Sequence, residues 1–260
     1  MTMNIVKHIP NTITSMNLLS GVLGVIFAFE GRFDISFYLM IAAGVFDFCD
    51  GLSARALKAY SNIGKELDSL ADLISFGLLP AIMLNRFMIA SINPESNVVM
   101  TIVCYIPLVI VVFSALRLAK FNVDERQTSS FIGLATPACA IICGSFIYFV
   151  SHDVSTSLND LDPSFTFLTE WARSPYLIPI MSVVLAGLLV SEIPMFSMKI
   201  KKGVKPDFKT HIMRMIFFGV FILSCLIVPI CGGNWSLIPL ITFVSYVLIN
   251  ICGAFFPDQE

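Results

Sequence analysis

Eight apolar segments, separated by short polar stretches, constrain the fold of this chain more than any other feature. Most of them reach the length of about 17–25 residues that a helix needs to cross a bilayer. The 260 residues are 57% apolar and only 13% charged, which is more apolar than the core of a soluble domain requires. Because backbone groups in hydrocarbon must bond internally, and the alternation of a β-barrel is absent, we expect an all-α polytopic membrane protein. The predicted spans are residues 14–29, 33–58, 66–90, 97–119, 132–151, 175–197, 211–231 and 234–256.

Basic residues are distributed unevenly among the loops between these spans. If both ends of the chain are cytoplasmic, 13 of the 16 lysines and arginines lie on the inner side, and only Arg32, Arg86 and Arg173 lie on the outer side. The inner set is Lys7, Arg55, Lys58, Lys65, Arg117, Lys120, Arg126, Lys199, Lys201, Lys202, Lys205, Lys209 and Arg214. The positive-inside rule therefore predicts that both termini, and the segment between spans two and three, are cytoplasmic.

The remaining features indicate one integral membrane domain over residues 1–260. The sequence has no internal repeat, and its start lacks the basic region and cleavage site of a secretory signal peptide. The seven cysteines lie in apolar segments, where we expect small buried residues rather than disulfides or metal ligands. We expect no nucleic-acid partner.

Four aspartates interrupt the apolar pattern in the stretch DFCDGLSARALKAYSNIGKELDSLAD, residues 47–72. Ionisable groups in spanning helices are costly, and they usually mark a site. Asp47 and Asp50 are three residues apart and share one helix face, while Asp68 and Asp72 are four apart and share another. A short turn joins the two helices as an antiparallel pair, so we expect the four carboxylates to converge.

Converging carboxylates cannot all stay ionised without cations. Hard oxygen ligands favour Mg²⁺, Mn²⁺ or Ca²⁺ over zinc, and a cluster of this size has room for two ions. Two other interpretations are open at this point, namely inert charges at helix ends and the ion pathway of a cation transporter or channel. The clustering at one membrane face and the lack of an inverted repeat argue against transport.

The residues between the aspartates suit an anionic ligand. Gly51 and Ala54 remove side-chain bulk, and Arg55 offers a guanidinium fork for phosphate. Ser61 supplies a hydroxyl in the turn, and Gly64 leaves space at the second helix. Metal ions beside an arginine are typical of phosphoryl-type transfer, in which positioning and charge neutralisation do most of the catalytic work.

The pattern Asp47-x-x-Asp50-Gly51-x-x-Ala54-Arg55, then eight residues, then Gly64-x-x-x-Asp68-x-x-x-Asp72 resembles the signature of the CDP-alcohol phosphatidyltransferase family at every fixed position. The resemblance covers residues 1–150. It implies a six-helix catalytic core with a polar cavity open to the cytoplasm, and a homodimer. It also implies transfer of a phosphatidyl group from CDP-diacylglycerol to an alcohol, with release of CMP.

The same resemblance implies a role for each signature residue. The aspartates Asp47, Asp50, Asp68 and Asp72 would bind Mg²⁺ or Mn²⁺, as two ions, and Asp72 would also take the proton of the attacking hydroxyl. Gly51, Ala54, Arg55, Ser61 and Gly64 would line the CDP-diacylglycerol site. Asn11 and Thr14 would reach the nucleotide, although capping of a helix is an equal alternative for Asn11.

Three stretches resemble the CDP-diacylglycerol–serine branch of the family, which implies L-serine as the acceptor. They are LDSLADLISFGLLPA, in which Leu73 rather than lysine follows the final aspartate, PNTITSMNLLSG, and ALRLAKFN followed by GLATPA. Ala135 departs from the proline expected for that branch, and glycerol phosphate, inositol phosphate and choline stay open as acceptors.

A cationic pocket would select the serine carboxylate, and Arg117, Lys120 and Asn122 are the candidates for it. The alternative for these residues is a role as topology signals or lipid headgroup contacts.

Overall fold

The computed structural model describes residues 2–92, 97–124, 131–156, 170–196 and 208–255. The first half consists of α1 (Thr2–Phe29), α2 (Phe33–Ala56), α3 (Asn62–Asp72), the π-helix η1 (Leu73–Leu78), α4 (Leu79–Ile92), α5 (Val98–Tyr105), the 3₁₀ turn η3 (Ile106–Leu108) and α6 (Val109–Val123). The second half consists of β1 (Phe131–Ile132), α7 (Thr136–Thr156), α9 (Leu177–Val190), β2 (Pro194–Met195), α10 (Phe208–Ile230) and α11 (Leu237–Phe255).

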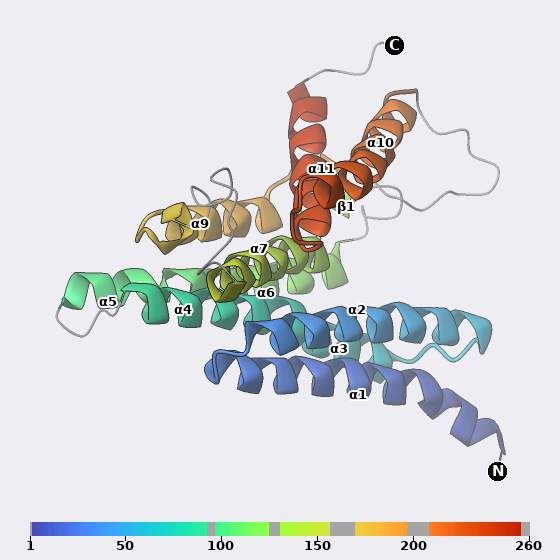
Figure 1. Ribbon diagram of the computed structural model, residues 1–260. Helices are drawn as coiled ribbons and strands as arrows, with labels where there is room; N and C mark the ends of the chain where they lie inside the picture. Colours follow the sequence, from blue (N-terminus) through green and yellow to red (C-terminus); the bar gives the residue numbers. More distant parts are fainter. Residues whose placement is uncertain (1, 93–96, 125–130, 157–169, 197–207, 256–260) are drawn as a thin grey trace.

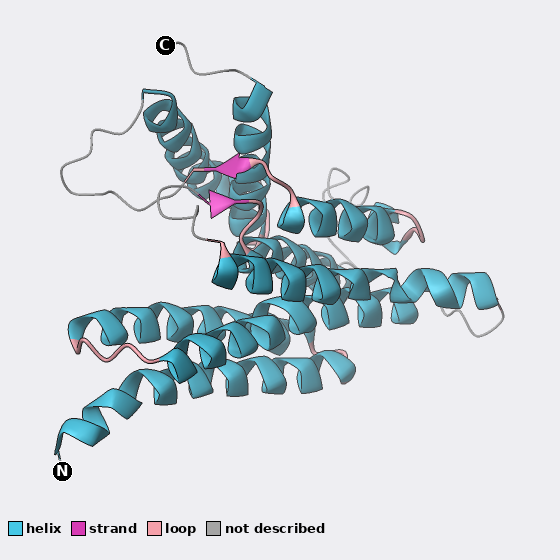
Figure 2. Ribbon diagram, turned by 180° about the vertical axis from the view of Figure 1, so that it is seen from behind, coloured by secondary structure: helices cyan, strands magenta, loops and turns pink. Residues whose placement is uncertain are grey.

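The helices form a layer at one side of the molecule and a hairpin at the other. Helices α1 and α2 lie side by side, and α3 folds back along them, while α10 and α11 stand at an angle beyond α7 (Figure 1). The only strands among the described residues are β1 and β2, which pair antiparallel, with Phe131 opposite Met195 (Figure 2). This short pairing connects the segment before α7 with the segment after α9.

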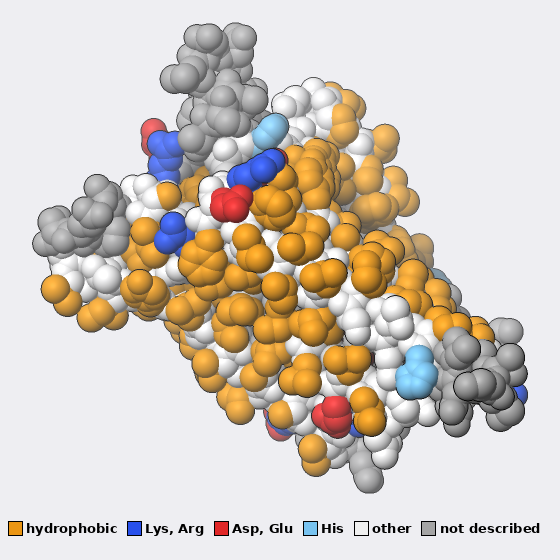
Figure 3. Space-filling view, turned by 90° about the horizontal axis from the view of Figure 1, so that it is seen from below, with side chains coloured by type: hydrophobic (Ala, Val, Ile, Leu, Met, Phe, Trp, Pro, Cys, Tyr) orange, Lys and Arg blue, Asp and Glu red, His pale blue; other side chains and the backbone are white. Residues whose placement is uncertain are grey.

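The helices confirm an all-α integral membrane protein. Within the described residues, six helices are long and apolar enough to cross a bilayer, and two further apolar helices, Thr136–His152 and Leu177–Val190, are shorter. Hydrophobic side chains cover most of the face seen from below, with few charges among them (Figure 3). Such a surface suits contact with lipid, because lipid chains keep apolar side chains away from water without burial in the protein.

The predicted span boundaries were wrong at several places. The fifth span begins at Thr136 of α7 rather than at residue 132, which lies in β1, and the two largest differences are in α1 and α9. Helix α1 does not begin at residue 14, because it runs through Pro10, and its apolar stretch covers His8–Phe29. Asn11 therefore lies inside a helix, which excludes the capping alternative. The predicted sixth span does not reach residue 197, because α9 already ends at Val190. The strand β2 begins at Pro194, which lacks the backbone N–H that a continued helix would need.

Close packing fixes α1 against the helix that carries Asp68 and Asp72. A methyl group added at Gly24 would lie 2.6 Å from Leu79 Cδ2 of α4, which is closer than van der Waals contact, so the glycine lets the two helices approach. The Ser75 hydroxyl donates to the backbone carbonyl of Asn17 at 3.1 Å. In the turn before α3, Lys58 takes a positive φ of 51°, and the Ser61 hydroxyl caps α3 by accepting from the Gly64 N–H at 2.9 Å.

All seven cysteines are free, and Cys104, Cys139 and Cys143 are buried in the apolar core. The expectation that they act as small apolar residues agrees with this placement. Five of the basic residues of the inner set lie outside the described residues, namely Arg126, Lys199, Lys201, Lys202 and Lys205.

Candidate active site

Three of the four aspartates meet between α2 and α3. One carboxylate oxygen from each of Asp47, Asp50 and Asp68 lies within 4.8 Å of the others. Asp50 is buried, and the other two are half-buried. Asp72 lies one turn further along α3, outside this set of three, and the charges of Asp47 and Asp68 act on it. The predicted convergence therefore holds for three residues, with Asp72 beside them.

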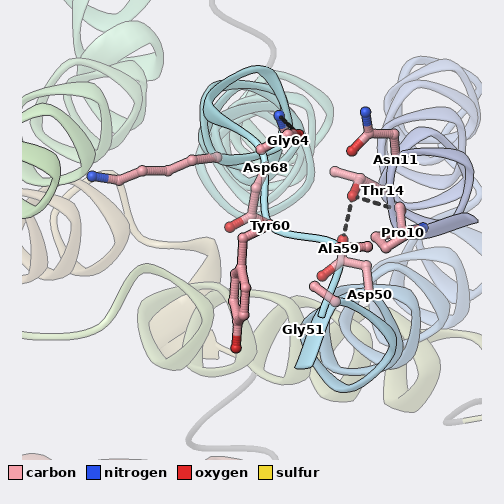
Figure 4. A pocket seen from close by; sticks show the side chains of 12 residues that line it. Pro10, Asn11, Thr14, Asp50, Gly51, Ala59, Tyr60, Gly64 and Asp68 are labelled. Carbon is pink, nitrogen blue, oxygen red and sulfur yellow. Dashed lines mark hydrogen bonds between the residues drawn. The ribbon is translucent and has the colours of Figure 1, made fainter. Parts of the chain in front are cut away.

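A cavity of about 200 Å³ opens next to these carboxylates. In the close-up, Thr14 from α1 points toward Asp50 of α2, while Asp68 reaches in from α3 (Figure 4). The lining residues are Pro10, Asn11, Thr14, Asp50, Gly51, Ala54, Ala59, Tyr60, Ser61, Gly64, Lys65 and Asp68. Six of the seven residues expected at the nucleotide site, all except Arg55, line this one cavity.

Helix α1 supplies a polar partner to each side of the cluster. The Thr14 hydroxyl donates to Asp50 Oδ2 at 2.6 Å, and the Asn17 amide Nδ2 donates to Asp72 Oδ1 at 3.2 Å. Thr14 and Asn17 are buried, and they lie three residues apart on one face of α1. These bonds fix two carboxylates in position and leave oxygens free to bind a ligand.

The glycines of the signature leave space in different ways. A methyl group added at Gly64 would lie 2.8 Å from Asn11 Oδ1 and 2.9 Å from Ser61 Oγ, so side chains already fill that side. At Gly51 the nearest atom to an added methyl would be Arg55 Nη2 at 3.9 Å. Packing within the protein therefore does not require glycine at position 51, and the open space there belongs to the cavity.

Arg55 stands at the rim rather than in the cavity. Its Nε donates to the Gly51 carbonyl at 2.8 Å, and the side chain is exposed near the end of α2. The other N–H groups of the guanidinium do not take part in this bond, so they can donate to an anion at the cavity mouth.

The three candidates for the acceptor site are held in different ways. Arg117 is buried, its Nη1 donates to Thr136 Oγ1 at 3.1 Å, and the charge of Asp72 acts on it. Lys120 forms an ion pair with Glu192 at 3.5 Å. The Asn122 side-chain amide donates to the Ser69 hydroxyl at 2.9 Å. The backbone carbonyl of Asn122 accepts from Lys65 Nζ at 3.1 Å. Of the three, Arg117 is the one tied to the aspartate cluster.

The donor set fits a hard divalent cation. Asp68 Oδ1 is buried without a hydrogen-bond partner, and the converging atoms are all carboxylate oxygens. Among the described residues no lysine or arginine forms a salt bridge with these aspartates. A buried anionic cluster of this kind needs a counter-charge, and oxygen ligands are those that Mg²⁺ and Mn²⁺ prefer.

Several residues of the site were not predicted. Asn17 is one of several polar residues in a mostly apolar helix, and Tyr60, Ala59, Pro10 and Lys65 carry no motif that would single them out. The π-helix that follows Asp72 was not predicted either, although such distortions are frequent at functional sites. A polar residue in a spanning segment is a usable signal, so Asn17 was the one residue that could have been found.

Comparison with known proteins supports the signature. A family model described as CDP-alcohol phosphatidyltransferase matches residues 7–172. A CDP-diacylglycerol–serine O-phosphatidyltransferase of Helicobacter pylori (strain ATCC 700392 / 26695) is 29% identical over 224 residues, which cover 85% of this chain and 84% of the relative. A protein of the same name from Bacillus subtilis (strain 168) is 34% identical over 146 residues, 55% of this chain and 77% of the relative. An archaetidylserine synthase of Methanothermobacter thermautotrophicus is 34% identical over 146 residues, 53% of this chain and 57% of the relative.

Proposed function

Because this chain belongs to the CDP-alcohol phosphatidyltransferase family, we propose that it transfers the phosphatidyl group of CDP-diacylglycerol to the hydroxyl of L-serine. The products are phosphatidylserine and CMP. The observation that carries the proposal is the cavity between α1, α2 and α3, which Asp50 and Asp68 line and beside which Asp47 completes a set of three converging carboxylates. The names of the relatives support serine as the acceptor.

In the proposed reaction the serine hydroxyl attacks the phosphorus that carries diacylglycerol. A new phosphorus–oxygen bond forms, and the bond from that phosphorus to the bridging oxygen of the pyrophosphate breaks, so that CMP leaves with the electron pair. The hydroxyl proton passes to Asp72, whose Oδ1 is held by the Asn17 amide. Asn17 thereby acts as a positioning residue for the base.

Asp47, Asp50 and Asp68 would hold the divalent metal, with Asp72 as a further ligand, and we propose two ions of Mg²⁺ or Mn²⁺. When bound, the metal supplies charge neutralisation for the pyrophosphate and the leaving CMP. The residues of the chain contribute orientation, because the Thr14 hydroxyl holds Asp50 in place at 2.6 Å.

The CDP group would occupy the cavity along Asn11, Gly51, Ala54, Ser61 and Gly64. Arg55 would contact a phosphate at the cavity mouth. The diacylglycerol chains extend into the bilayer, which the apolar exterior of the helices permits.

For the acceptor, Arg117 is the favoured partner of the serine carboxylate, because it is buried beside Asp72 and held by Thr136. Lys120 and Asn122 are secondary candidates, since each already has a partner in α9–β2 or α3.

We also propose that residues 1–260 act as one domain, that the enzyme is a homodimer, and that the site and both termini face the cytoplasm. Arg55 and Arg32 support the orientation, because they lie at opposite ends of α2 and belong to the predicted inner and outer sets. Labelling of Lys65→Cys in intact cells, in a background without native cysteines, tests it. Labelling from outside would refute the proposed topology.

An acceptor panel tests the function. Purified protein is incubated with CDP-diacylglycerol, Mn²⁺ and isotope-labelled serine, glycerol phosphate, inositol phosphate or choline, and both CMP and the labelled lipid are measured. We expect CMP and labelled lipid in equal amounts with serine alone. Labelled lipid formed from another alcohol, with none from serine, would refute serine as acceptor and keep the reaction class.

A further inference from the structure

A second cavity lies at the opposite end of the α1–α2 pair from the aspartates. Its volume is about 360 Å³, and its walls include Asp34, Tyr38, Tyr148, Ser151 and His152. Asp34 stands in the first turn of α2 and precedes Asp50 by 16 residues, or about 24 Å along the helix axis. The proposed transfer reaction makes no use of this cavity.

Aromatic rings from α2 and α7 line this cavity, and the Trp235 ring packs against two of them. The hydroxyls of Tyr38 and Tyr148 form a hydrogen bond of 2.8 Å between α2 and α7. Trp235, from the turn before α11, stacks on Tyr38 with an interplanar angle of 11°. The His152 ring stacks on Tyr148 at 21°. The cavity therefore has aromatic walls that are already held in place by one another.

The wall of this cavity carries one carboxylate, that of Asp34, beside two tyrosine hydroxyls, the Ser151 hydroxyl and the His152 ring. Asp34 contributes an exposed carboxylate, and none of the described lysines and arginines forms a salt bridge with it. The guanidinium of the neighbouring Arg32 lies over the Phe27 ring of α1 at 5.4 Å. Ser151 uses its hydroxyl proton on the Tyr148 carbonyl at 3.1 Å, so its oxygen can still accept.

We propose that this cavity binds an ammonium group. The faces of tyrosine and tryptophan attract cations, and a carboxylate beside them supplies the opposite charge. The ammonium can belong to a lipid headgroup, since Tyr and Trp of membrane proteins lie at headgroup level, or to a small free amine.

Trp235 gives a direct readout of binding. The chain contains two tryptophans, so Trp171→Phe leaves Trp235 as the single fluorescent reporter beside Tyr38. One arm titrates the purified full-length variant in detergent with ethanolamine or choline. A second arm places it in nanodiscs of phosphatidylglycerol with a rising fraction of phosphatidylethanolamine. We expect a saturable change in Trp235 emission in at least one arm, and the responding arm identifies the source of the ammonium.

Two further variants separate binding from simple membrane anchoring. Asp34→Asn should raise the half-saturating concentration by about threefold or more, as expected for an exposed ion pair. Glu30→Gln, which changes a nearby exposed acid outside the cavity wall, should leave it unchanged. Phosphatidyl transfer should persist in both variants, which shows that they fold. Emission that does not respond in either arm, or an Asp34→Asn titration equal to that of Trp171→Phe alone, would show an interfacial aromatic anchor only and overturn the proposal.

Discussion

The helices that carry the aspartates and the hairpin at the C-terminal end are all apolar enough to cross a bilayer, but they bury their surfaces differently. Mean hydropathy is 1.7 for Asn62–Ile92 and 2.3 for Lys209–Ile230. In the most apolar stretch of each helix, 67% of the residues of the first and 17% of those of the second are buried inside the protein. Ile216, Phe218 and Ile222 of α10 are exposed. Because lipid accepts apolar side chains as readily as a protein core does, hydropathy cannot distinguish the two situations.

Buried polar groups separate the two regions more clearly. Thr14, Asn17, Asp50 and Ser75 meet where α1 packs on α2, α3 and η1, and their bonds lead to the aspartate cluster. At the hairpin, Asn250 accepts from the Phe196 N–H at 2.8 Å and holds α11 to β2. The network around α1 ends at carboxylates with free oxygens, so we assign a catalytic role to it. The bond of Asn250 ends at a backbone N–H, so we assign it the structural role of holding α11 in place.

The largest expected effect lies in the aspartate region. Asp47→Asn, Asp50→Asn and Asp68→Asn should each lower kcat by about 100-fold or more, because each removes charge from the metal ligands. Asp72→Asn should do the same through loss of the base. Steady-state CMP release measures this, with Glu30→Gln as the matched control. Near-normal turnover in any two of the four variants would exclude this site as the catalytic centre.

Arg117 sharpens the comparison, because it lies on α6 between the two regions. If it pairs with the serine carboxylate, Arg117→Ala should raise KM for serine by about 10- to 150-fold and leave KM for CDP-diacylglycerol nearly unchanged. Arg117→Lys should recover only part of the loss, since the charge returns without the fork. Thr136→Val should act in the same direction and more weakly. An unchanged serine KM in active Arg117→Ala would remove this residue from the acceptor site.

Alanine substitutions at three glycines compare the aspartate region with the C-terminal hairpin, because the space around each glycine differs. Gly64→Ala forces a methyl against Asn11 and Ser61, so KM for CDP-diacylglycerol should rise about fivefold or more, and Tm should fall. Gly51→Ala should raise that KM without lowering Tm, because its methyl enters only the cavity. Gly219→Ala of α10, with nothing within 4 Å, should leave KM unchanged and gain about 1 kcal/mol of helix propensity. Equal effects at positions 64 and 219 would contradict the assignment of the cavity.

The smallest kinetic effect should come from a substitution that breaks the contact between α11 and the segment after β2. Asn250→Leu leaves the buried Phe196 N–H without its partner, at a cost of about 1–3 kcal/mol, so Tm in detergent should fall by a few degrees. Both Michaelis constants should stay the same below the transition. Ser245→Ala, which loses a hydroxyl bonded within α11, is the control. A large rise in either constant would mean that α11 takes part in substrate binding.

The sequence predicted the aspartate pair of helices well, because the spacing of charges on a helix determines which side chains share a face. It also predicted the apolar helices themselves. Its failures have a common origin in contacts between distant segments. The Asn17–Asp72 bond depends on how α1 is aligned against α3, and the end of α9 depends on pairing of Pro194 with Ile132, so neither follows from local pattern.

The role of Arg55 could be predicted only in part. Its place in the signature indicates phosphate, but the position of the side chain at the rim depends on the bond to the Gly51 carbonyl. The separation of Asp72 from the other three acids likewise follows from the spacing of turns in α3 against α2. A motif gives the set of residues, while the packing of helices decides which of them share one ligand.

Metal dependence of serine-driven CMP release tests the central claim most directly. Purified protein is treated with EDTA, exchanged into metal-free buffer with CDP-diacylglycerol and serine, and then supplied with Mg²⁺ or Mn²⁺. We predict that CMP release falls to background without metal, returns with either ion, and requires serine, because the converging carboxylates of Asp47, Asp50 and Asp68 need a cation to act on the pyrophosphate. Full serine-dependent CMP release from the metal-free protein would contradict the account.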